Sequence, residues 1–197
     1  MTSPDLPIAT DRLVLRSFTR DDFAGYAAYH RLPELQRHFD RPARDDAECR
    51  AALDMACRQN RITRPGDILT LAVTRARDNT VLGEISLTWT DATAAQAELD
   101  CILNPRFTGL GYAREAVRAA LDHGFERFAF HRVFARCAAG NTKAVRLLKG
   151  LGMRLEAHFR EHALYRGEWD DELLFAVLRR EWRRGAEVKE FDRHRVA

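Results

Sequence analysis

The stretch Arg106-Phe107-Thr108-Gly109-Leu110-Gly111-Tyr112-Ala113, near the middle of the 197-residue chain, decides the fold. It follows a predicted strand and Pro105, which cannot donate to a strand ladder, and it opens a long predicted helix. Gly109 and Gly111 allow the backbone to approach a ligand closely. Because the first amides of a helix lack internal acceptors and carry partial positive charge, we predict that this loop binds a pyrophosphate.

Two other nucleotide-binding motifs fit this stretch poorly. The P-loop pattern G-x-x-x-x-G-K-[ST] is absent from the chain. Residues 109–114 lack the third glycine of the dinucleotide fingerprint and lie in the middle of the chain. On two glycines alone, a plain turn without a ligand is an equal alternative.

The strongest helical period of the chain follows the loop. Apolar residues from Ala113 to Phe128 recur at intervals of three and four, which predicts a long amphipathic helix. A second helix begins after Asn141, a good cap, and ends near Gly150 and Gly152. Seven strand candidates lie at residues 12–16, 68–74, 81–90, 96–103, 132–137, 153–164 and 172–178.

Two further helices are predicted before the loop. Thr19 and Asp22 form a capping-box-like start for the first. The second spans residues 45–59, where the spacing of the apolar residues predicts one buried side. That side carries Ala47, Ala51 and Met55.

This order of elements predicts a single α/β (α+β) domain with a mixed, mostly antiparallel sheet of about seven strands and helices on both faces. The strand, helix and strand between residues 96 and 137 should form a parallel unit. We expect the domain to span residues 10–180. Residues 1–9 would then be disordered or extended, and residues 181–197 a basic helix or tail.

The composition excludes several classes of protein. Hydrophobic residues make up 46% and charged residues 31% of the chain, a globular balance. The formal net charge of +3 gives no strong field toward nucleic acid or acidic lipid, so we expect no DNA partner. No secretory signal or apolar run of membrane-spanning length occurs, which predicts a cytoplasmic protein with no membrane partner.

The cysteines and histidines do not indicate a metal site. The four cysteines form no C-x-x-C pair and are expected to be reduced and structural. His158 and His162 have the spacing of a helical metal pair, but they lie in a predicted strand, where such residues are over about 13 Å apart. We therefore predict that no metal is bound.

Four segments resemble one known family. Arg106-x-x-Gly109-x-Gly111-Tyr112-Ala113 resembles the acetyl-CoA signature of the GNAT N-acetyltransferases. The segment from Asn141 to Met153 resembles the family's second motif. Residues 10–16 and 167–171 resemble the start and the final hairpin of the ribosomal-protein-alanine N-acetyltransferase (RimJ/RimL-like) branch. The segments occur in the family's order over about 170 residues, so the resemblance implies a GNAT-type domain.

The resemblance implies acetyl-CoA as co-substrate and locates its contacts. The pantetheine arm would pair with the strand positions of Ile102 and Leu103. Asn141 would hold that arm, or it is a plain helix cap; both interpretations stay open. The pyrophosphate would lie on the backbone amides of Arg106, Thr108, Gly109, Leu110, Gly111, Tyr112 and Ala113.

In the family, an amine attacks the thioester directly, so Cys101 and Cys137 are interpreted as packing residues. The reaction needs a route for the proton of the amine and a proton for the leaving thiolate. Glu98 and Glu84 in the predicted meander are the candidate bases.

The general acid is where the sequence departs from the family. Ala144 and Leu148 stand where relatives carry serine or tyrosine, and neither donates a proton. Glu161 and His162 lie close to a position where some relatives have a carboxylate. Water is the alternative proton donor.

The acceptor is left open by the sequence. Near pH 7 an α-amine is roughly 14% neutral and a lysine only about 0.04%, so a water relay to Glu98 would serve an α-amine but not a lysine. The leading hypothesis is a protein N-terminus. The alternatives are a small-molecule amine and a non-catalytic acyl-CoA-binding protein, and a homodimer is an open alternative. Phe39, Trp89 and Trp169 would wall an acceptor cleft or pack in the core.

Overall fold

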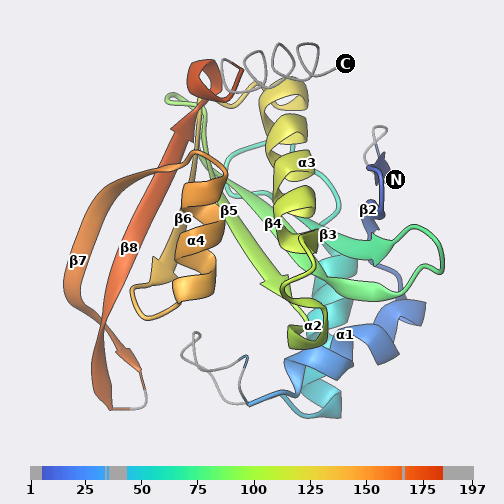
Figure 1. The fold of residues 1–197 in the computed structure, drawn as a ribbon. Coiled ribbons are helices and arrows are strands. Elements are labelled where there is room, and N and C mark those ends of the chain that lie inside the picture. Colours follow the sequence, from blue (N-terminus) through green and yellow to red (C-terminus); the bar gives the residue numbers. More distant parts are fainter. Residues whose placement is uncertain (1–5, 34, 36–43, 166, 184–197) are drawn as a thin grey trace, which may run out of the picture.

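A computed structural model of the chain describes residues 6–33, 35, 44–165 and 167–183. These residues form an eight-stranded sheet of order β1-β2-β3-β4-β5-β6-β8-β7 (Figure 1). Neighbouring strands are antiparallel except β5 and β6, which are parallel. The strands are β1 (Ile8–Ala9), β2 (Leu13–Ser17), β3 (Ile68–Arg75), β4 (Val81–Asp91), β5 (Gln96–Leu103), β6 (Arg132–Ala138), β7 (Arg154–Tyr165) and β8 (Glu168–Leu178).

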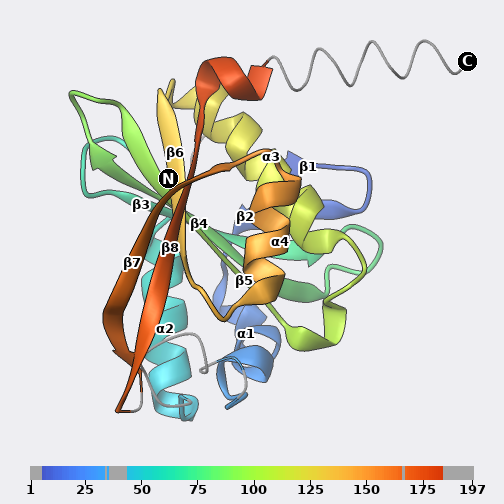
Figure 2. The same cartoon turned by 60° about the vertical axis from the view of Figure 1, so that its left-hand side comes forward.

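Helices cover both faces of this sheet (Figures 1 and 2). They are α1 (Phe23–His30), α2 (Asp46–Arg58), α3 (Tyr112–Arg127) and α4 (Thr142–Gly150), with 3-10 turns η1 (Arg20–Asp22) and η3 (Pro105–Phe107). The predicted α/β class and mixed sheet are confirmed, with β1 as an additional strand paired to Leu15 and Val14. The parallel unit predicted between residues 96 and 137 is β5-α3-β6.

Two apolar clusters hold the layers together. The larger joins α3 to one face of the sheet, and Val117, Leu121 and Phe125 are its helical members. The smaller joins α1 and α2 to the other face, where Tyr29 and Leu53 pack with sheet residues. The central strands are therefore buried on both faces, which fixes the position of each strand end relative to the helices.

The predicted buried side of α2 is wrong. Cys49, Leu53 and Ala56 face the sheet, whereas Met55 is 55% exposed and Ala51 is also exposed. The buried residues recur at four and three, so the helix has an apolar stripe of the expected period. The wrong stripe was predicted because alanine carries little hydrophobic signal and a cysteine packs as a small apolar residue.

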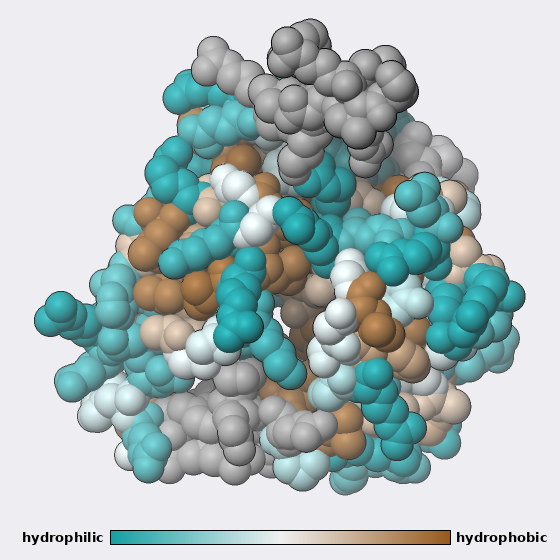
Figure 3. All heavy atoms as spheres, viewed as in Figure 1, coloured by the Kyte–Doolittle hydropathy of each residue, from teal (hydrophilic) through white to brown (hydrophobic). Residues whose placement is uncertain are grey.

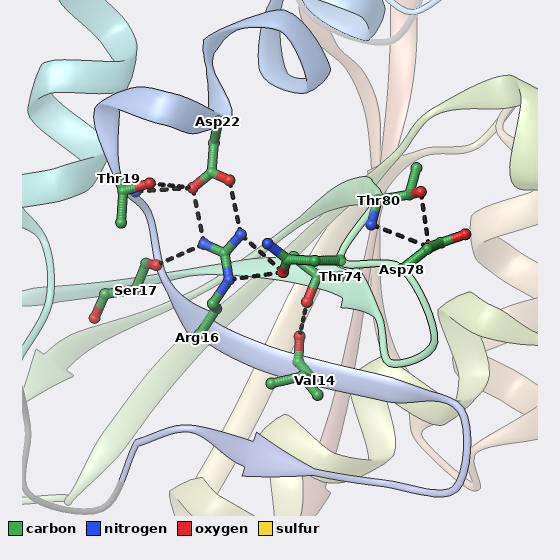
Figure 4. Close-up of polar contacts among 9 residues, drawn as sticks. Val14, Arg16, Ser17, Thr19, Asp22, Thr74, Asp78 and Thr80 are labelled. Atoms are coloured by element: carbon green, nitrogen blue, oxygen red, sulfur yellow. Dashed lines mark hydrogen bonds and ion pairs between the residues drawn. The ribbon is translucent and has the colours of Figure 1, made fainter.

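Local polar contacts fix the start of the N-terminal helices. The side chain of Asp45 accepts a hydrogen bond from the amide of Glu48, and the side chain of Glu48 accepts one from the amide of Asp45. This capping box starts α2. At η1, Arg16 on β2 donates to both carboxylate oxygens of Asp22, at 2.8 and 2.7 Å, and Thr19 donates to the same carboxylate (Figure 4). Burial alone would raise the pKa of Asp22, but these hydrogen bonds lower it.

The C-terminal part of the described chain packs on α3. Trp182 is 8% exposed, donates from Nε1 to Asp122 at 2.6 Å and lies 6.3 Å from the ring of Phe125. Residue 182 falls in the segment that was expected to form a basic helix or tail. Residues 1–5 and 184–197 lie outside the described residues, so the expectation for both termini stays a prediction.

Candidate functional site

The parallel strands β5 and β6 separate and open the sheet. They pair only over three positions, from Gln96 with Arg132 to Glu98 with Phe134. Beyond these pairs a cavity of about 100 Å³ lies between the strands, closed by residues of α3 and α4. In the space-filling view the surface is hollowed here, with apolar residues at its bottom (Figure 3). We call this opening the splay cavity.

The glycine loop leads from β5 to the start of α3. Gly109 and Gly111 have φ values of +81° and +82°, a conformation that L side chains rarely adopt. Gly111 is the N-cap of α3. Within the described residues, no acceptor is bonded to the amides of residues 109–114. Six successive amides without an intramolecular acceptor at a helix start are an arrangement that can bind an anion.

Two of the predicted pyrophosphate contacts are engaged elsewhere. The amide of Arg106 donates to Asn104 Oδ1 at 3.1 Å, and the amide of Thr108 donates to the carbonyl of Pro105 at 3.2 Å. Both bonds belong to the 3-10 turn η3. The amides without an intramolecular acceptor therefore begin at Gly109, and the pyrophosphate contacts predicted for Arg106 and Thr108 stay a prediction, with the exposed side chain of Arg106 beside the loop.

An N-terminal residue anchors this loop. Arg12 lies 2.6 Å from Glu115 on α3 and donates to the carbonyl of Leu110 at 3.0 Å. Its guanidinium also lies 4.8 Å from the ring of Tyr112. Thr10 donates to Glu115 at 2.7 Å, and the hydrogen bonds from Thr10 and Arg12 lower the pKa of Glu115 against the raising effect of burial. The sequence placed these residues only in a family-like segment and did not reveal the contact.

The far wall of the splay cavity comes from α4. Asn141 lines the cavity and its Oδ1 accepts from the amide of Ala144 at 3.1 Å, so the capping interpretation is confirmed while a pantetheine contact stays a prediction. Ala144 and the buried Leu148 line the same cavity. As the sequence indicated, neither of these two side chains can donate a proton to a leaving thiolate.

The cysteines of the cavity are poor nucleophiles. Burial raises the pKa of Cys101 to about 12 and that of Cys137 to about 11. Both thiols therefore stay protonated at neutral pH. Both side chains also pack against the larger apolar cluster, which agrees with the packing role predicted for them.

A second cavity opens on the α1 and α2 side of the sheet. It has a volume of about 610 Å³ and lies between α2 and strands β3 to β5. The exposed side of α2, including Ala51 and Met55, lines it, so the face that was wrongly expected to enter the core borders this space. We call this space the acceptor cleft. Within the described residues, its charged lining consists of Glu48, Glu84, Asp100 and Arg44.

The structure places the two predicted bases differently. Glu84 lines the acceptor cleft, where it accepts from Tyr29 Oη at 3.1 Å and lies 3.4 Å from His30 Nε2. Glu98 lies at the closed end of the splay, lines neither cavity, and is 3.5 Å from Arg136 Nε. Burial and then the nearby Asp100 raise the pKa of Glu98. Their catalytic role stays a prediction.

Sequence reasoning missed Asp100, which lines both cavities. Its partner across the strands is Ser86, and the neighbouring pairs are Glu84 with Ile102 and Thr88 with Glu98. Directly opposite residues share a face, so the three acids of β4 and β5 lie on one face of the sheet. The alternation of residues 98 and 100 could have revealed this, but the motif match drew attention to Glu98 alone.

The other predicted candidates lie away from the two cavities. His162 lies 3.6 Å from Glu172, which in turn lies 3.7 Å from Arg136, so this histidine lies at one end of a row of polar side chains that reaches Glu98. His158 pairs instead with Asp171 at 2.6 Å.

The regular alternation of a strand is interrupted around Glu161, because the pairing of β7 and β8 shifts register between Phe159 and Ala163. Glu161 itself has φ of +47° within this irregularity. The face of each side chain there cannot therefore be derived from strict alternation.

The three aromatic residues that were predicted to line an acceptor cleft or to pack in the core lie in different places. Trp89 packs beside Phe130, at 6.1 Å between ring centroids, which is the packing alternative. Trp169 is 63% exposed and lines neither cavity. Phe39 lies outside the described residues. Within the described ranges, no helix is long and apolar enough to cross a membrane and no group of His, Cys, Asp or Glu is arranged for a metal.

Comparison with known proteins agrees with this geometry. Residues 12–154 match the model of the acetyltransferase (GNAT) domain. A stretch of 85 residues is 38% identical to the uncharacterized N-acetyltransferase YnaD of Bacillus subtilis and covers 43% of the chain and 50% of YnaD, about half its length. The [ribosomal protein uS5]-alanine N-acetyltransferase of Escherichia coli is 25% identical over 191 residues, with 92% of the chain and 95% of that protein covered.

Solved structures share the fold. The chain superimposes on spermidine N-acetyltransferase from Vibrio cholerae, solved with CoA and spermine, with a TM-score of 0.75 and 22% identity. The superposition covers 88% of this chain and 99% of that one. At this identity the likeness supports the fold alone.

Proposed function

Since the chain belongs to the GNAT acetyltransferase family, we propose that it moves the acetyl group of acetyl-CoA to a primary amine by direct attack. The observation that carries this proposal is the row of unpaired amides from Gly109 to Arg114 beside the splay cavity. A diphosphate fits such a row because each oxygen accepts from N–H groups that have no other partner. The anchored position of Leu110 and Tyr112 keeps this row preorganised.

The pantetheine arm would enter the splay cavity along β5. Ile102 lines that cavity, and Leu103 is the last residue of the strand before η3. Because β6 no longer pairs with β5 at this level, the polar groups of the exposed strand edge are free to bond an amide-bearing ligand. The thioester supplies an activated carbonyl, and the acceptor amine would reach it from the acceptor cleft on the other face.

The acceptor we propose first is the α-amine of a protein N-terminus, as in the RimJ/RimL-like branch. The full-length similarity to the uS5-alanine N-acetyltransferase supports this choice. An α-amine also needs less help in losing its proton, about 3.5 kcal/mol less than a lysine amine. A cleft of about 610 Å³ that is open to the surface has room for an extended terminus.

A small cationic amine is the second candidate. Among the residues that the structure describes, three carboxylates, on Glu48, Glu84 and Asp100, line the acceptor cleft against the one guanidinium of Arg44. This excess of negative charge favours an acceptor with more than one ammonium group. Among relatives, the Vibrio cholerae spermidine N(1)-acetyltransferase is 24% identical over 150 residues.

The proposed function is tested by thiol release from acetyl-CoA across a panel of peptides with free N-termini and small amines. Amine-dependent release, with the acetyl group found on the amine, supports an enzyme. Tight acetyl-CoA binding without release above background would instead indicate a non-catalytic acyl-CoA-binding protein, for which Ala144 and Leu148 are the motivating residues. If Gly109→Val and Gly111→Val together leave acetyl-CoA affinity unchanged, the loop does not hold the pyrophosphate.

A further inference from the structure

We propose that Asp100 is the general base that takes the proton of the acceptor ammonium, and that it does so from the point where the splay cavity meets the acceptor cleft. This assignment rests on the proposed acetyl transfer. It gives the base role to a residue that neither the motifs nor the similarity to other proteins indicated.

Asp100 lies where the two cavities meet. Among the residues that the structure describes, Asp100 alone lines both the splay cavity and the acceptor cleft. Its strand neighbours Leu99, Cys101 and Ile102 line only the first, and Ser86 opposite it lines only the second. A group that accepts a proton from the attacking amine must lie within hydrogen-bond reach of it or one water away. The junction of the two cavities is where donor and acceptor can meet.

The second step is that the carboxylate of Asp100 is free to act. Within the described chain no hydrogen bond or ion pair engages it. Glu84, by contrast, is held by Tyr29 and His30 on α1, and Glu98 faces Arg136 across the splay. A carboxylate that already accepts hydrogen bonds is a weaker base than one without partners, because those bonds stabilise its charged form.

The charges around Asp100 affect its pKa. Asp100 stays exposed to solvent at the two cavities, yet partial desolvation by the surrounding protein and then the charge of Glu84 raise its pKa, and Arg136 opposes them. Several charged or titratable groups of the described residues lie around the site, and Glu84 and Arg136 act on Asp100 most directly. These groups are Glu84 on β4, Glu98 and Cys101 on β5, Arg136 on β6, Glu172 on β8, Glu48 on α2, and Arg44 before α2. Because the carboxylates outnumber the cations, the field favours proton uptake by Asp100.

The acceptor ammonium gives one proton to the carboxylate of Asp100, and the neutral nitrogen attacks the thioester carbonyl carbon. The new N–C bond forms, and the C–S bond then breaks with its electron pair leaving on sulfur. The nitrogen releases a second proton, which the thiolate takes up through solvent, since Ala144 and Leu148 supply no acid. Asp100 then returns its proton to water, so the net products are amide, thiol and one proton.

The test compares Asp100→Asn with wild type, using an amine that the wild-type protein acetylates. Asparagine keeps the shape but cannot accept the proton, so we expect kcat to fall about 100-fold or more while acetyl-CoA affinity changes less than about twofold. In wild type, kcat/KM should rise with pH as Asp100 ionises. This acid limb should be missing from Asp100→Asn, whose kcat/KM should rise only at higher pH, with deprotonation of the amine itself. Asp21→Asn is the matched control, since Asp21 is exposed on η1 and lines neither cavity.

A rescue experiment separates a base from a structural residue. Asp100→Ala should regain part of its rate when formate is added, whereas the control variant should not respond. An Asp100→Asn protein that stays within about threefold of wild type and keeps the acid limb would overturn the assignment. So would a Glu98→Gln protein that loses this limb while Asp100→Asn keeps it. Absence of thiol release from wild type with every amine would refute the acetyl transfer itself, and the base assignment with it.

Discussion

Replacing Gly111 with alanine adds a single Cβ atom and tests whether the conformation of the loop is needed to bind the pyrophosphate. Gly111 has φ of +82°, and an L residue in this left-handed conformation costs roughly 1–2 kcal/mol. The added Cβ would lie 3.3 Å from Arg12 Nη2, so the guanidinium must give way. Arg12 is 49% exposed, and weakening its ion pair with Glu115 adds at most about 1 kcal/mol after solvent screening.

The strain is relieved most directly if the loop changes its conformation. The sum of about 1–3 kcal/mol then appears as a loss of acetyl-CoA affinity of about 5- to 150-fold. Isothermal titration calorimetry with acetyl-CoA measures this loss. The same titration with acetyl-pantetheine, which has no pyrophosphate, should show little change between wild type and variant.

Gly66→Ala is the matched control. Gly66 has φ of +89° in the loop before β3, and an added Cβ would meet no atom within 4 Å. This variant should lose about 1–2 kcal/mol of folding stability and keep its acetyl-CoA affinity. The reasoning is refuted if Gly111→Ala binds acetyl-CoA as wild type does, or if it loses affinity for acetyl-CoA and acetyl-pantetheine equally.

Three further predictions follow from contacts elsewhere in the molecule. Arg12→Gln removes the anchor of Leu110 and Tyr112 and should weaken acetyl-CoA binding about 3- to 10-fold by calorimetry; unchanged binding would show that the loop keeps its shape without it. Asp22→Asn breaks the partly buried pair with Arg16 and should lower the free energy of urea unfolding by on the order of 3 kcal/mol at pH 7. Because folding lowers the pKa of Asp22, this stability is fully present above the unfolded pKa of about 4 and is lost as pH falls through the folded pKa. The free energy of unfolding should therefore fall less steeply with decreasing pH in the variant than in wild type. Equal slopes for the two proteins would contradict the contribution of the pair. Cys101 and Cys137, with pKa values raised to about 12 and 11, should react with a disulfide reagent at pH 8 more than about 100-fold slower than in the unfolded protein, and fast labelling of the native thiols would contradict their burial.

The features that the sequence predicted well are those encoded over short distances. The period from Ala113 to Phe128 predicted α3, because six of its apolar positions enter one side of the helix. The same holds for the helix caps at Asn141 and Thr19, where the two hydrogen-bonded residues lie only three positions apart in the sequence. The glycine loop was located for the same reason, since its left-handed backbone requires the residue that is present.

The features that the sequence did not reveal depend on residues that lie far apart in the chain. Arg12 and Glu115 meet only because β2 passes beside the start of α3. The importance of Asp100 depends on where β5 and β6 cease to pair, which no local pattern records. The buried side of α2 was misjudged because packing on the sheet, and not the strength of the local apolar signal, selects between two weak stripes.

The most direct test of acetyl transfer is a paired measurement of thiol release and acetylated amine from one reaction with acetyl-CoA. Direct attack predicts one thiol released for each acetyl group that mass spectrometry finds on the amine, with no acetyl group left on the protein at any time. No amine-dependent release, or an acetyl group trapped on Cys101 or Cys137, would contradict it.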